Sequence, residues 1–212
     1  MLTYCPRCQK KINGKFCSEC GAKGTEQHQV NNLNGTNWRA EKDLRQLITN
    51  QKVQEFIKKF LDESRQSISA EEFLEKIDKL FLPGTGVSLK KLMEVTVPIY
   101  RNLGIQTGKS KTDHFDYSIQ EVLVKLLCSL AKNNYPLKEV HEAHEGILLV
   151  AEIPSSMKTF GGDILITLEE KLPKTSVHIA AKIKGQLYDW GKSKAVIKAL
   201  FLDIEGITLD LD

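Results

Sequence analysis

Four of the chain's five cysteines lie within its first twenty residues, as two pairs with the spacing C-x2-C. Eight residues separate the two pairs. Four thiolates at this spacing can surround one zinc ion tetrahedrally, and they leave no open position for a catalytic water. A segment this short cannot build a hydrophobic core, so the metal has to supply its folding energy. The sequence therefore predicts one structural zinc ion held by Cys5, Cys8, Cys17 and Cys20.

The residues around these cysteines are similar to a known family. An Asn-Gly dipeptide at Asn13, between the pairs, is a strong hairpin signal, while Phe16 and Gly21 flank the second pair. With both pairs, they make residues 4–23 resemble the short zinc-ribbon domains at the amino termini of many bacterial proteins, although Gln9 stands where that family usually has glycine. Such ribbons contact nucleic acids, dock onto proteins or act as structural clips. The resemblance therefore implies a metal and leaves the activity open.

Composition and charge limit the class of protein further. Of the 212 residues, 41% are hydrophobic and 27% are charged, which is typical of a folded globular protein. No apolar run approaches the roughly 20 residues of a membrane-spanning helix, and the first residues lack the apolar core of a signal peptide. We therefore expect a cytoplasmic protein without membrane insertion, and in such a reducing compartment clustered cysteines favour metal binding over disulfide bonds.

The pattern along the chain predicts four regions. We expect a zinc ribbon over residues 1–24 and a flexible linker over residues 25–37, which are polar and rich in Asn and Gln. A helical region over residues 38–112 and an α+β domain over residues 113–212 follow. The first 112 residues carry a net charge of +7 and the remaining residues carry −4, which give the overall +3.

Helical periodicity is clearest in two segments of the middle region. The first carries one apolar stripe with the spacing of a helix face, formed by Val53, Phe56, Ile57, Phe60 and Leu61. The second begins with a capping box, in which Ser69 precedes Glu72 by three residues. An apolar stripe of this kind is typical of a helix that buries one face in a core.

The α+β domain begins with another capping box, formed by Ser118 and Glu121, at the start of a helix. Four strands follow, of which the last two alternate apolar and polar residues, and a final helix covers one face of the resulting antiparallel meander. We place these strands at about 138–144, 147–153, 163–169 and 176–184, and the final helix at about 189–202. The order of elements, with residues 185–192 before the last helix, resembles small α+β domains of uncharacterised bacterial families that look like half of a helix-grip fold.

Several other polar groups invite a functional interpretation, but none has the required pattern. Residues 104–110 have three residues between two glycines, whereas a phosphate-binding loop needs four. His141 and His144 are three apart near a strand end, which directs them to opposite faces of the sheet. No nucleophile accompanies the acidic residues and histidine of residues 113–116, and Cys128 is predicted to be an inert thiol on a helix. We therefore expect no catalytic and no cofactor-binding residues apart from the zinc ligands.

These features favour a non-enzymatic zinc-binding adaptor or regulatory protein that acts through protein–protein interaction, with an unknown protein partner. Two alternatives stay open. One is nucleic-acid binding through the ribbon and the basic helical segment, based on the charge of residues 1–112 and on the basic residues beside the cysteines, which are Arg7, Lys10, Lys11 and Lys15. The other is binding of a hydrophobic ligand by the C-terminal α+β domain.

Overall fold

The computed structural model describes residues 3–4, 11–12, 37–64, 69–80, 90–91, 109–143, 145–155, 161–183 and 191–210. The chain divides into two units, residues 1–36 and residues 37–212. In the first unit, strand β1 (Thr3–Tyr4) pairs antiparallel with strand β2 (Lys11–Ile12), with Tyr4 opposite Lys11. The predicted zinc ligands Cys5, Cys8, Cys17 and Cys20 lie outside the described residues, as does the Asn-Gly turn at Asn13.

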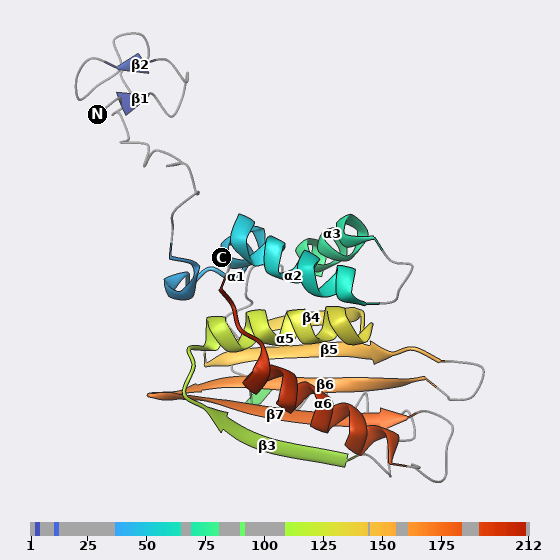
Figure 1. The fold of residues 1–212 in the computed structure, drawn as a ribbon. Helices are drawn as coiled ribbons and strands as arrows, with labels where there is room; N and C mark the ends of the chain where they lie inside the picture. Colours follow the sequence, from blue (N-terminus) through green and yellow to red (C-terminus); the bar gives the residue numbers. More distant parts are fainter. Residues whose placement is uncertain are drawn as a thin grey trace. The chain divides into compact units, whose positions relative to one another are not determined.

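The second unit is built on a five-stranded antiparallel sheet (Figure 1). Its strands are β3 (Lys109–Phe115), β4 (Leu137–Ala143), β5 (Gly146–Ile153), β6 (Gly162–Lys171) and β7 (Lys174–Ile183). They lie in the order β3-β7-β6-β5-β4, so β4 to β7 form the meander that the sequence predicts, and β3 is added beside β7. The α+β class is therefore confirmed.

The predicted number of strands is wrong, because the sheet has five strands and not four. The additional strand, β3, has the sequence KSKTDHF, which contains no alternation of apolar and polar residues. Its residues lie at an edge of the sheet, and only Phe115 among them is buried. An edge strand without a buried face gives no period-2 hydrophobic signal, so the pattern from which strands are predicted is missing here. The strand also spans residues 112 and 113, where the prediction separates the helical region from the α+β domain.

Helices α5 (Ile119–Asn133) and α6 (Lys192–Gly206) lie on one face of the sheet (Figure 1). The predicted cap of α5 is confirmed, since the Ser118 Oγ accepts a hydrogen bond of 3.2 Å from the backbone N–H of Glu121. Under these helices, the strand register places Leu149, Ile166 and Ile179 side by side, and all three are fully buried. The helices thus cover the face that the alternating strands require to be covered.

The described elements that precede the sheet in this unit include the 3-10 helix η1 (Trp38–Ala40) and helices α1 (Leu44–Thr49), α2 (Gln51–Glu63) and α3 (Ala70–Leu80). The predicted stripe of α2 is confirmed, because Val53, Phe56, Ile57 and Leu61 are buried, with Phe60 partly buried. Helix α2 packs against α5, so α5 has the sheet on one side and a helix on another. Every residue from Val122 to Ala131 is consequently buried, and the helical region shares one continuous core with the sheet.

In the part of the chain that the structure describes, no helix is long and apolar enough to cross a membrane.

Candidate functional site

Of the two histidines considered as metal ligands, only His141 lies within the described residues. The His141 Nε2 lies 3.0 Å from the Glu139 Oε2, its neighbour on the same face of β4. His144 lies outside the described residues. Among the residues with described positions, no group of three His, Cys, Asp or Glu side chains is placed to hold a metal ion.

The acidic residues near the start of α5 are engaged in ion pairs. The Asp113 Oδ2 lies 2.7 Å from the Lys111 Nζ, and the Asp116 Oδ1 lies 3.0 Å from the Lys174 Nζ. The hydrogen bond from Lys111, together with one from the backbone N–H of His114, holds the pKa of Asp113 below its usual value. A carboxylate stabilised in its charged form, as Asp113 is, is a poor general acid near neutral pH.

The Cys128 thiol is buried in α5, as the sequence predicts. Burial raises its pKa well above the ordinary value for a cysteine, because the charged thiolate loses its hydration. A thiol in this state is neither a nucleophile nor a metal ligand at neutral pH.

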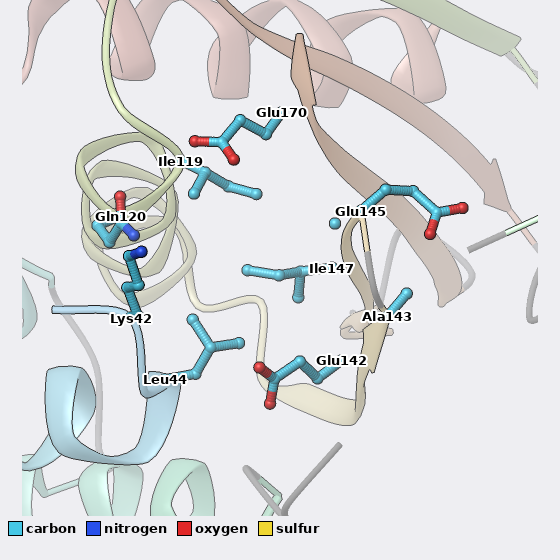
Figure 2. Close-up of a pocket in the computed structure, with 10 residues that line it drawn as sticks. Lys42, Leu44, Ile119, Gln120, Glu142, Ala143, Glu145, Ile147 and Glu170 are labelled. Atoms are coloured by element: carbon cyan, nitrogen blue, oxygen red, sulfur yellow. The ribbon is translucent and has the colours of Figure 1, made fainter. Parts of the chain in front are cut away.

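One open pocket lies where α1, the start of α5 and the ends of three strands meet (Figure 2). It has a volume of about 270 Å³. In Figure 2 the side chains of Leu44, Ile119 and Ile147 lie around the central space, while the polar side chains surround them. These polar residues are Lys42, Gln120, Glu142, Glu145 and Glu170.

Backbone contacts fix the strand side of this pocket. Glu145 lies in the turn just before β5, which begins at Gly146, and the backbone N–H of Glu170 donates a hydrogen bond of 3.2 Å to the Glu145 carbonyl. A Cβ atom at Gly146 would lie only 2.0 Å from the Leu168 carbonyl oxygen, so a larger residue at this position would push β5 away from β6. The glycine thus allows the close approach of backbones that aligns Glu145 with the end of β6.

The charge of the pocket is negative, with three glutamates against one lysine. Burial raises the pKa of Glu142 above its usual value, and the nearby negative charge of Asp43 acts in the same direction. Such a rim attracts a cationic group and repels an anionic one. The three glutamates thus give the pocket the chemistry of a binding surface for a cationic group.

Sequence reasoning missed this pocket as well as two polar pairs of the sheet. Lys138 pairs with the buried Asp163 at 3.2 Å, and the Thr112 Oγ1 lies 2.8 Å from the His178 Nδ1. The partners in each pair are 25 and 66 residues apart, so only the strand order brings them together. The turn at Glu145 can be predicted from the sequence, but no local sequence pattern indicates that this turn lies close to α1 and α5.

Comparison of the chain with protein-family models, curated proteins and solved structures found no match.

Proposed function

We propose that this chain is a non-enzymatic adaptor or regulatory protein that binds one structural zinc ion and acts through a protein partner in the cytoplasm. In this proposal Cys5, Cys8, Cys17 and Cys20 hold the zinc and residues 37–212 form a separately folded body. The arrangement resembles that of bacterial proteins with an N-terminal zinc ribbon.

The observation that carries the proposal is the spacing of four cysteines within a unit of their own. The antiparallel pairing of Tyr4 with Lys11 supports it, because this pairing closes a connection of six residues that contains Cys5 and Cys8. A connection of this length, closed at both ends, could direct both sulfurs of a C-x2-C pair to one ion. With all four ligands supplied by the protein, the ion would have no free position for a substrate.

The polar groups of the body support an adaptor over an enzyme. Asp113 and Asp116 are paired with lysines, and Cys128 is buried with a raised pKa. The body is joined by one continuous core that connects its helices to its sheet. In this proposal the body and the small zinc unit together hold a partner.

A capture experiment with matched variants tests the proposal. The full chain, a variant with Cys5 and Cys17 changed to serine, and a Cys128→Ala control are used to capture partners from the cells of origin, with and without nuclease treatment. We expect one zinc per chain in the wild type and the control, and a protein partner that withstands nuclease and is lost only with the double serine variant. Absence of bound zinc in all three proteins would refute the proposal.

Nucleic-acid binding is the alternative that the charge of residues 1–112 favours. It predicts salt-sensitive retention on DNA or RNA and a loss of retention when Lys10 and Lys11 are both changed to glutamate. It also predicts that nuclease treatment removes the captured partner. Native mass spectrometry addresses the third candidate, a hydrophobic ligand, because such a complex would show a mass beyond the protein and one zinc.

A further inference from the structure

The two edges of the five-stranded sheet differ in how they are protected. The β4 edge has a register shift between Leu137 and Glu139, and α3 packs against this strand. A bulge and a covering helix are two common means of preventing edge-to-edge association. By contrast, β3 pairs with β7 in one unbroken register from Lys109 to Phe115.

The outer edge of β3 has the properties of a pairing surface. Among the strands that the structure describes, β3 ends the sheet order, and in Figure 1 it is the last strand on its side. Four consecutive residues, Lys109 to Thr112, are exposed, and so is His114. A regular edge strand of seven residues presents unpaired backbone N–H and C=O groups that a further strand can use.

The sequence of β3 is complementary to itself about Thr112. When two copies of KSKTDHF are aligned antiparallel with Thr112 opposite Thr112, each Lys111 lies opposite an Asp113 of the other copy. Centring the alignment on Lys111 would place two lysines opposite each other, and centring it on Asp113 would place two aspartates opposite each other. Directly opposed like charges destabilise a strand pair and opposite charges stabilise it. The charges thus select one register, and it has the two-fold symmetry of a homodimer.

The charged side chains are already placed for this pairing. Lys111 and Asp113 share one face of the strand, where their charged atoms lie 2.7 Å apart. The Lys111 Nζ also lies 4.6 Å from the centre of the Phe201 ring on α6, which restricts the lysine side chain. Two copies in the symmetric register would join two such pairs into a ring of four alternating charges. Little side-chain freedom would then be lost on association.

We propose that the exposed edge of β3 pairs with the same edge of a second copy of this chain, giving an antiparallel homodimer centred on Thr112 with one ten-stranded sheet. The dimer is a weak one, because an edge contact alone lies at the small end of specific protein interfaces. Each complex would carry two N-terminal units, and a partner with two matching sites would therefore bind more tightly through avidity.

Sedimentation velocity of the full chain over a range of concentrations tests the dimer and its register. We expect a concentration-dependent dimer in the wild type. Lys111→Asp and Asp113→Lys should each weaken it about tenfold or more, because the symmetry introduces every substitution twice. The double variant with both changes exchanges the two charges, and it should restore the dimer to within about threefold of the wild type. A wild type that stays monomeric at every concentration, or single variants that dimerise as well as the wild type, would overturn the proposal.

A disulfide test fixes the position of the two-fold axis. In the proposed register, the two Thr112 Cα atoms would be about 4.5–5.5 Å apart, which is within reach of a disulfide. Ser110 lies on the same face, but its two copies would be four residues apart along the strands, or about 13 Å. We expect Thr112→Cys to form a dimer linked through residue 112 on mild oxidation, and Ser110→Cys to form none through residue 110. Equal cross-linking of the two variants would contradict the register.

Discussion

The two units of this chain differ in what holds them together. The first, residues 1–36, contributes two strands of two residues each to the described structure, and its sequence carries the predicted zinc ligands. The second, residues 37–212, has one hydrophobic core that runs from Trp38 to Leu209. Metal ligation would stabilise the first unit and apolar burial stabilises the second. A change to one source of stability should therefore leave the other unit intact.

Removal of zinc should have the largest effect, and it should be confined to the first unit. Structural zinc sites supply on the order of 10 kcal/mol of apparent binding energy, which is far more than a segment of this length gains from burial. We expect a Cys17→Ser variant, or a strong chelator, to abolish zinc binding and to collapse the amide NMR signals of residues 1–24.

The urea midpoint of the body should stay unchanged in that experiment, and Cys128→Ala serves as the control that keeps all four ligands. A shift of the body's unfolding transition when zinc is removed would show that the two units are energetically coupled.

The reverse perturbation removes side-chain volume from the core of the body. Leu126 is fully buried in α5, with the sheet on one side of this helix and α2 on another. We expect Leu126→Ala to lower the free energy of unfolding by about 2–5 kcal/mol, because a buried leucine leaves a cavity that the surroundings fill only in part.

Leu202→Ala is the matched control, since Leu202 is 54% exposed on α6. It should change stability by less than about 0.5 kcal/mol. Zinc content should equal that of the wild type in both variants, and a loss of zinc in Leu126→Ala would argue against independent units.

The elements that the sequence predicted are those whose local pattern agrees with their tertiary role. Helix α2 buries Val53, Phe56 and Ile57 along one stripe, and the hydroxyl of Ser118 caps α5 as its spacing to Glu121 indicates. Strands β6 and β7 have apolar residues at every second position on the face that meets the helices, whereas β5 is apolar and buried along almost its whole length. Their signal is local, so no knowledge of partners is needed to find them.

The features that the sequence did not reveal depend on partners far away along the chain. Strand β3 consists mainly of exposed polar residues and is a strand because it pairs with β7, about 65 residues further on. The pocket combines Lys42 with Gln120, Glu142 and Glu170, which only the assembled fold brings together. The zinc ligands differ from these features, because the spacing of a C-x2-C pair is a local pattern that can be recognised without knowledge of the fold. That site stays a prediction from spacing.

A polar contact between helices tests whether the body also depends on specific hydrogen bonds. The Asp203 carboxylate on α6 accepts hydrogen bonds from three residues of α5: Ser129 at 2.6 Å, Lys132 at 2.8 Å and Asn133 at 2.9 Å. Ser129 is fully buried, so it would be left without this acceptor in Asp203→Ala. We expect a loss of about 1–3 kcal/mol in the free energy of unfolding, measured by urea denaturation.

Glu205→Ala on the same helix provides a control, because Glu205 is exposed. Its stability should lie within about 0.5 kcal/mol of the wild type. Equal losses in the two variants would mean that the effect comes from helix α6 as a whole and not from the Asp203 hydrogen bonds.

The smallest effect concerns the pocket. Burial, together with the charge of Asp43, raises the pKa of Glu142 in the folded body above its value in the unfolded chain. The folded state therefore holds the proton more tightly, and this residue's contribution to stability falls as the pH rises through the ordinary glutamate range toward the raised pKa. We expect Glu142→Gln to be more stable than the wild type at pH 7 by less than about 1 kcal/mol, since the side chain keeps contact with water.

Below the ordinary glutamate pKa, where the wild-type carboxyl is protonated in both states, the stability advantage of Glu142→Gln should vanish. Urea midpoints at pH 7 and pH 3.5 measure the change, with Glu63→Gln at the exposed end of α2 as the control. An advantage of equal size at both pH values would come from the amide itself and would contradict a raised pKa in the pocket.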